Sequence, residues 1–218
     1  MTLKSLWLPV VFVLPLLAQT PAAVSLPKPE THGGKPLLQA LAERKSEREF
    51  ASRDLTPQTL ANLLWAGFGI NRLDGHRTAP SAMNRQTIDI YVVRADGAYL
   101  YDAAKNQLSP VAAGDLRAAT GTQDFVGRAP LNLVYVSNYV YVSNYAKMGR
   151  TPALDQAIFS GAEAGFVGQN VYLYCASEGL ATVIRASIDK DALTKALKLK
   201  PEQHIVLAQT VGYPRLSR

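Results

Sequence analysis

Apolar residues that recur every three or four positions predict five helices in this chain. They cover residues 36–44, 56–68, 115–119, 155–181 and 189–197. Pro57 suits a first helical turn, where the N–H group that proline lacks has no partner within the helix. Asp189 or Asp191 is expected to cap the last helix, because a short carboxylate accepts a bond from a free N–H group there.

Alternating, β-branched and aromatic residues predict strands. They lie at residues 88–93, 99–102, 131–136 and 204–211, with a further extended segment at 181–187. Helices and strands are interspersed along the chain, which indicates a domain that contains both. Ala95-Asp96-Gly97-Ala98 is expected to form a hairpin turn between the first two strands.

The hexapeptide Val134–Tyr139 is followed by a second copy, Val140–Tyr145, without a mismatch. Side chains in a strand alternate with period two, so six inserted residues keep every inward position inward. Two copies exceed the strand length that the sheet is expected to pair. One copy should therefore pair in the sheet, while the other protrudes or bulges.

The composition fits one globular domain after a short leader. Of the 218 residues, 48% are hydrophobic and 18% are charged, and the formal net charge is +6. The basic residues are dispersed and carry no nucleic-acid motif, which favours a solvated surface with a local anion site. Cys175 is the only cysteine, so no intrachain disulfide can form, and its apolar surroundings predict a buried, inert thiol.

The first residues have the pattern of a secretory signal peptide. A short basic start is followed by an apolar core at residues 6–17 and by small residues that suit cleavage after Ala18, Ala22 or Ala23. An uncleaved N-terminal anchor is the alternative. We expect a signal peptide at residues 1–22, a linker at 23–36 and one domain at 37–218.

Arg44-Lys45-Ser46-Glu47-Arg48 is a candidate anion site. In an extended segment, alternate residues share one side, so Arg44, Ser46 and Arg48 would converge there. Two guanidinium groups and a hydroxyl suit a phosphate or an anionic heterocycle. The interleaved acids could instead pair with the arginines on an exposed surface, and the segment alone leaves both interpretations open.

A second candidate is the loop Arg77–Gln86, which leads into the strand at residues 88–93. Pro80 fixes one backbone angle, and Ser81 is short enough to bond a backbone group or a ligand. The side-chain amides of Asn84 and Gln86 carry donors and acceptors that read the edge of a planar heterocycle.

The long helical pattern contains Gly161, Ala164, Gly165 and Gly168 at three- and four-residue spacing. Glycine costs a helix about 1 kcal/mol relative to alanine, so this face indicates close packing. Its partner is another helix, a ligand or the protein's own sheet.

Taken in order, these features resemble the nitroreductase family of FMN-dependent oxidoreductases, and within it the SagB-type, azoline-oxidising dehydrogenases. The resemblance spans roughly residues 37 to 215. Its motifs are Arg44-x-Ser46-x-Arg48-x-Phe50, Leu63-Leu64-Trp65-Ala66, Gly69-Ile70-Asn71-Arg72, Arg77-Thr78-Ala79-Pro80-Ser81-Ala82-x-Asn84-x-Gln86, Tyr99-x-Tyr101-Asp102, Gly165-x-x-x-Gln169-Asn170, Gly179-Leu180-Ala181-Thr182-Val183 and Val211-Gly212-Tyr213-Pro214.

The resemblance implies an α+β fold with a small mixed central sheet flanked by helices. It also implies an obligate homodimer with FMN at the interface, and the small-residue face then becomes the dimer seam. Arg44 and Ser46 would grip the phosphate and ribityl chain, and Arg48 would face the pyrimidine end of the flavin. The remaining implied cofactor residues are Pro80, Ser81, Ala82, Asn84, Gln86, Thr182, Val183, Arg185, Ala186, Ser187 and Arg215.

The resemblance implies an FMN-dependent oxidoreductase that transfers hydride through flavin N5, with no dedicated catalytic side chain and no metal. The leader adds the expectation that this enzyme is exported to the periplasm. Reduced nicotinamides are not expected outside the cytoplasm, so an exported enzyme needs another hydride source. A non-catalytic flavin-binding or interaction protein that retains the pocket is the alternative.

Overall fold

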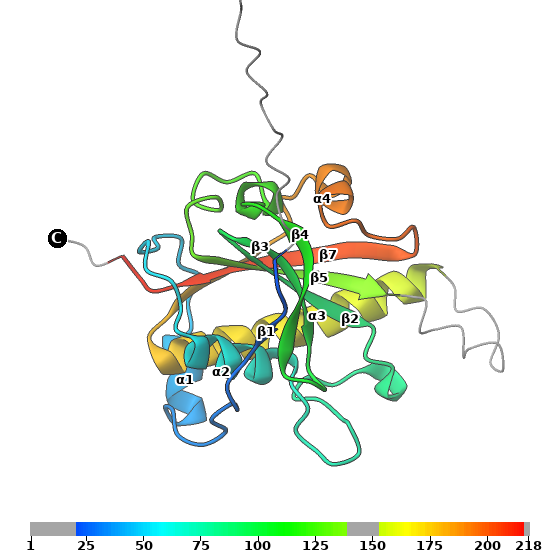
Figure 1. Cartoon of the computed structure of the whole chain (residues 1–218). Helices are drawn as coiled ribbons and strands as arrows, with labels where there is room; N and C mark the ends of the chain where they lie inside the picture. Colours follow the sequence, from blue (N-terminus) through cyan, green and yellow to red (C-terminus); the bar gives the residue numbers. More distant parts are fainter. Residues whose placement is uncertain (1–20, 139–152, 216–218) are drawn as a thin grey trace, which may run out of the picture.

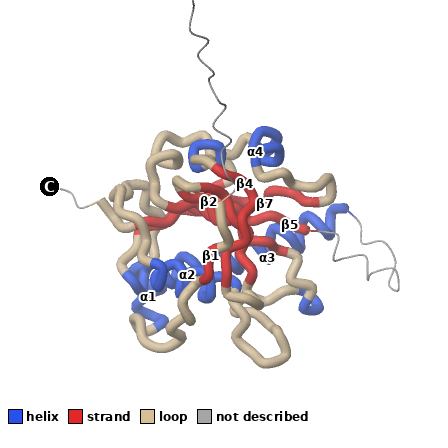
Figure 2. The backbone as a smooth tube through the Cα atoms, in the orientation of Figure 1, coloured by secondary structure: helices blue, strands red, loops and turns tan. Residues whose placement is uncertain are grey.

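A computed structural model describes residues 21–138 and 153–215. Its centre is a seven-stranded sheet in the order β1-β4-β3-β2-β5-β7-β6, shown as arrows in Figure 1 and in red in Figure 2. The strands are β1 Val24–Ser25, β2 Ile88–Arg94, β3 Gly97–Asp102, β4 Gln107–Ala113, β5 Leu131–Asn138, β6 Ala181–Arg185 and β7 Gln203–Gly212.

Every strand pair in these described ranges is antiparallel, so the expectation of a mixed sheet was wrong. The chain order explains the difference. The crossover from β5 through the long helix makes β6 parallel to β5, but β7 lies between them and pairs with both. The α+β class itself is confirmed.

Helices cover both faces of the sheet (Figure 1). On one face lie α1 Leu37–Glu43, α2 Pro57–Phe68 and α3 Ala153–Glu178, and on the other lie α4 Lys190–Ala196 and the 3₁₀ turn η2 Arg117–Thr120. Two buried apolar clusters match these layers. One joins α2 and α3 to the sheet, and the other joins α4 to the opposite face.

The predicted helices and strands are largely confirmed, as α2 illustrates. Its apolar stripe is almost fully buried, and Thr56 caps its start by accepting a bond from the backbone N–H of Thr59 at 3.1 Å. Asp189 caps α4 in the same way, through the N–H of Ala192. Cys175 is buried as expected, and burial raises the pKa of its thiol.

The segment that was expected to be a linker packs on the domain instead. Val24 and Ser25 pair with β4, a strand that the sequence analysis missed, and Leu26 belongs to the buried core. Further along, Glu30 bonds Asn62 of α2 through its backbone N–H at 2.8 Å. Residues 24–35, which we call the strap segment, therefore link the helical face to the sheet.

The small-residue face of α3 divides into two. Gly168 faces the sheet, since a Cβ placed there would lie 2.5 Å from the Cδ1 atom of Ile184. Gly161 and Gly165 face outward, with no heavy atom within 4 Å of such a Cβ. The outer side of α3 also carries exposed apolar side chains, namely Leu154, Ile158, Phe159 and Phe166.

The predicted apolar stripe of α1 is also exposed. The exposed fractions of Leu37, Leu38 and Leu41 are 64%, 79% and 44%. Together with the outer side of α3, this stripe leaves apolar surface without a partner within the described chain.

The first five residues of the first hexapeptide copy lie in β5, where Val134–Ser137 pair with both β2 and β7 and Asn138 pairs with β7. Tyr139, the whole second copy and residues 1–20 of the predicted signal sequence fall outside the described residues. Among the helices that the structure describes, none is long and apolar enough to cross a membrane.

Candidate functional site

The Arg44–Arg48 segment is extended and lies against α3 and the start of β6. The guanidinium group of Arg44 lies over the ring of Tyr172, 5.2 Å from its centroid. The hydroxyl groups of Ser46 and Tyr172 share a hydrogen bond of 2.7 Å. Alternate residues therefore meet the same α3 side chain, as the spacing predicted, and Tyr172 itself accepts a bond from the backbone N–H of Ile184.

The ion pairs around this segment leave its two arginines available. Lys45 pairs with Glu47 at 3.2 Å, and Arg215 pairs with Glu49 at 3.8 Å. In the described ranges, the guanidinium groups of Arg44 and Arg48 have no ion pair and no hydrogen bond with another residue. The interleaved acids Glu47 and Glu49 thus pair with other cations, so the alternative in which they pair with the two arginines is not what the structure shows.

The Pro80–Gln86 loop lies elsewhere, beside the first half of α3. Its hydroxyl and amide groups mostly bond within the protein. Ser81 donates to Glu163 at 2.7 Å and accepts from the backbone N–H of Gln86 at 2.7 Å. The side chain of Gln86 accepts from Arg77 and donates to Asn84 and to the carbonyl of Gly75.

Ser81 and Gln86 therefore brace the loop, and their side chains do not extend toward a ligand as the sequence suggested. A ligand would meet the outer parts of the loop. Pro80 is exposed, and Ala82 and Asn84 are partly exposed.

At the end of β6, Arg185 points into the protein. Its guanidinium group donates to the carbonyl and hydroxyl of Thr120, to Asn132 and to Thr210. Burial lowers its pKa to about 10. The side chain is thus occupied by internal bonds, so only the backbone at this position is left for a cofactor, while Ala186 and Ser187 are exposed.

The predicted site residues form separate groups in one chain. Thr182 joins the Arg44–Arg48 group, because its carbonyl accepts a bond from the backbone N–H of Glu47 at 2.9 Å. The Pro80–Gln86 loop is anchored at Glu163, nine residues before Tyr172 on α3. A helix rises 1.5 Å per residue, so the two anchors lie roughly 13 Å apart along the helix axis.

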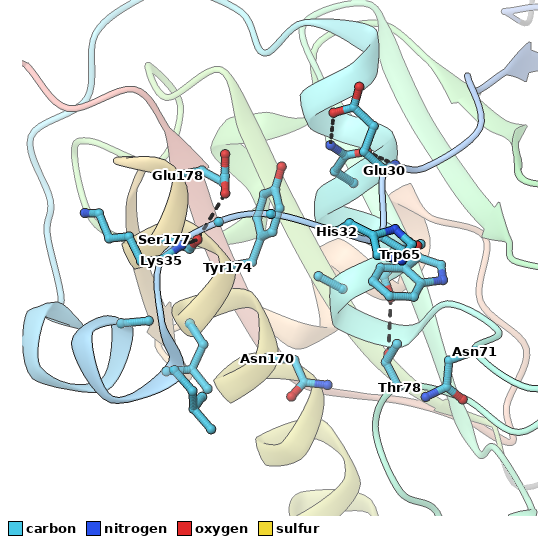
Figure 3. Close-up of a pocket in the computed structure, with 18 residues that line it drawn as sticks. Glu30, His32, Lys35, Trp65, Asn71, Thr78, Asn170, Tyr174, Ser177 and Glu178 are labelled. Carbon is cyan, nitrogen blue, oxygen red and sulfur yellow. Dashed lines mark hydrogen bonds between the residues drawn. The ribbon is translucent and has the colours of Figure 1, made fainter.

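A cleft of about 640 Å³ opens between the strap segment, α2 and α3 (Figure 3). It is lined by the motif residues Trp65, Asn71, Thr78 and Asn170, together with Tyr174 and Glu178. None of the predicted cofactor residues lines it. Many of its polar groups bond to protein, as Ser177 does with Glu178 and Thr78 with the carbonyl of Trp65. Leu37 of the exposed α1 stripe also borders the cleft.

Sequence reasoning missed Glu163, which is 97% buried and bonded to the Pro80–Gln86 loop. A signal was present, since this acid interrupts the otherwise small and apolar run Gly161–Val167. A buried carboxylate needs several partners to offset its lost hydration, and the nearby polar loop can supply them.

Comparisons with known proteins identify the family of this chain. The model of the Nitroreductase family matches residues 41–213. The chain belongs to the nitroreductase family. A relative from Methanocaldococcus jannaschii, named "Putative nitroreductase MJ1384", is 30% identical over 185 residues, which cover 79% of this chain and 88% of the relative.

Solved nitroreductase structures match the fold as well. A crystal structure described as a "putative nitroreductase" from Ralstonia eutropha JMP134 has a TM-score of 0.83 at 39% identity, covering 96% of this chain and all of that one. The NADPH:FMN oxidoreductase of Vibrio harveyi, solved with NAD⁺, has a TM-score of 0.61 at 18% identity, covering 83% of this chain and 67% of that one. Membership of the nitroreductase family makes this protein a flavin-dependent type of oxidoreductase.

Proposed function

We propose that this nitroreductase-family protein is an FMN-dependent oxidoreductase that works as a homodimer and acts outside the cytoplasm. The observation that carries the proposal is the pair of uncompensated cations at Arg44 and Arg48, which flank Ser46 while the adjacent charges pair with one another. Anions bind where positive charge is held ready and unpaired.

The residues of this group fit FMN. The guanidinium of Arg44, held over Tyr172, suits a phosphate, and the hydroxyl of Ser46 suits the phosphate or the ribityl chain. Arg48 would face the pyrimidine end of the isoalloxazine ring, where a cation stabilises negative charge that develops on reduction. Bound FMN would supply hydride transfer at N5.

A homodimer would bring the two groups of site residues together. In one chain the Pro80–Gln86 loop and the Arg44–Arg48 segment lie at different levels of α3. The exposed apolar side of α3, with Gly161 and Gly165 at its centre, would allow a second α3 to approach closely. A two-fold axis at that contact would carry the loop of one subunit toward the arginines of the other.

Export and the branch of the family rest on the sequence alone. The apolar core at residues 6–17 and the small residues after it support cleavage and a periplasmic location. The run of motifs from Arg44 to Pro214 supports the SagB-type branch. An exported enzyme would take hydride from a substrate directly and pass electrons to oxygen or a quinone.

Anaerobic photoreduction of the purified protein, followed by reoxidation with oxygen and quinones, tests this function. A flavin spectrum that bleaches and then returns with an acceptor supports an oxidoreductase. A bound flavin that no acceptor reoxidises would instead support the alternative of a non-catalytic flavin-binding protein. Protein that takes up no FMN on reconstitution would overturn the proposal.

A further inference from the structure

We propose that Glu163 is a positioning residue whose buried carboxylate holds the Pro80–Thr87 loop in the conformation that it presents to a flavin. The inference rests on the proposed function, since it concerns the same site.

Four donors from this loop converge on the two carboxylate oxygens of Glu163. Oε1 accepts from the hydroxyl of Ser81 at 2.7 Å and from the backbone N–H of Ala82 at 3.2 Å. Oε2 accepts from the hydroxyl of Thr87 at 2.6 Å and from its backbone N–H at 3.2 Å. Only 3% of Glu163 is exposed, so these bonds replace the water that the carboxylate has lost.

The backbone between these contacts has an unfavourable conformation. Met83, Asn84 and Gln86 have φ angles of 55°, 53° and 53°, in the left-handed region that Met and Gln rarely adopt and that Asn tolerates better. Three residues with positive φ in a stretch of four would not keep this backbone conformation without contacts from outside the stretch. Glu163 bonds the residues just before and just after the stretch, and it thereby fixes both ends of the strained turn.

An acid is required here, because all four partners donate. The two backbone N–H groups have no acceptor to offer, and the Ser81 hydroxyl already accepts from Gln86. A glutamine side chain would turn an N–H₂ group toward one pair of these donors and leave at least one of them unbonded. The carboxylate therefore provides an acceptor for each of the four donors of the loop.

The test compares Glu163→Gln with the unaltered full-length protein and with Glu178→Gln. Glu178 is a matched control, because it lies on the same helix but is exposed, and its carboxylate accepts a hydrogen bond from the neighbouring Ser177 and none from the Pro80–Thr87 loop. Three quantities are measured: hydrogen exchange of the Ala82 and Thr87 amides without FMN, the FMN dissociation constant, and the midpoint potential of the bound flavin.

We expect Glu163→Gln to speed exchange of those two amides, to weaken FMN binding by about tenfold to a hundredfold, and to shift the midpoint potential. Glu178→Gln should change none of the three. The isosteric Thr87→Val removes one donor and provides a milder variant if Glu163→Gln fails to fold. It should cause a smaller shift in the same direction.

Two outcomes would overturn the inference, and they can be told apart. If the unaltered protein binds FMN and Glu163→Gln and Thr87→Val bind it with the same constant and potential, Glu163 has no positioning role. If the unaltered protein takes up no FMN, the proposed function fails, and the positioning role fails with it.

Discussion

Replacing Gly165 with alanine should stabilise the single folded chain but weaken the association of two chains. Within one chain the new methyl group points into open space, with no heavy atom within 4 Å. Alanine is then favoured over glycine in the helix by about 1 kcal/mol. For a domain of this size that gain corresponds to a rise in melting temperature of about 2–4 °C.

In a dimer that packs α3 against the α3 of the second subunit, each subunit would place one new methyl group in the close contact between the two helices. Overpacking of a tight contact costs about 1–3 kcal/mol, which weakens the dimer roughly fivefold to a hundredfold. Sedimentation equilibrium measures the dimer constant, and melting curves below that concentration measure the single chain.

Gly168→Ala is the control, because Gly168 faces the protein's own sheet. Its methyl group would press on Ile184, so this variant should lower the melting temperature of the single chain and spare the contact between chains. A Gly165→Ala variant that melts higher but dimerises as tightly as the unaltered protein would refute the seam on α3.

Three further predictions concern the cofactor, the leader and the repeat. Arg44→Ala should weaken FMN binding by about 1.5–3 kcal/mol in a fluorescence titration. Lys45→Ala removes a cation already paired with Glu47 and should change FMN binding little, so equal losses would contradict a specific role for Arg44. Intact mass of protein from the periplasmic fraction should show the loss of roughly twenty residues, and full-length protein confined to the cytosol would disprove export. Deletion of Val140–Tyr145 should leave FMN binding intact and the melting temperature equal or higher, since Val134–Asn138 of the first copy already pair in β5. A deletion variant that aggregates would show that the second copy is structural.

Local patterns predicted most of the elements because their signals are local. The stripe of α2, the cap at Thr56 and the alternation in β7 each occupy consecutive residues and need no distant partner. The strand β4 was missed because Pro110 interrupts its alternation, and proline is usually excluded from paired strands. Pro110 lies opposite Tyr99 of β3 but beyond the two residues of β4 that pair with β1, so it has a strand neighbour on one side only among the described residues.

Features that depend on distant partners were not predictable in this way. The strap at residues 24–35 has the Pro and Gly content of a linker, yet its order comes from Asn62, Asn106 and Ser177, which lie far along the chain. Which α3 glycines face the sheet and which face outward depends on where the sheet packs on the helix. Periodicity alone does not specify this.

The candidate site shows the same limit. The alternation of Arg44, Ser46 and Arg48 correctly predicted a shared side for the first two. Which acids pair with which cations depended on Lys45 and Arg215, and only the fold brings the latter near Glu49. Likewise, the inward bonds of Ser81 depend on Glu163, more than eighty positions later in the sequence.

Both edges of the sheet are covered over a short stretch, and this affects how copies of the protein can associate. At one edge β4 is capped by the two-residue strand β1. At the other, the segment before Phe50 runs beside β6, and Glu47 donates its N–H to Thr182. An open edge recruits further strands without limit and leads toward fibres. With both edges partly covered, the exposed apolar side chains of α1 and α3 remain as the larger surface for association. A contact through such a surface, made about a two-fold axis, closes at two copies.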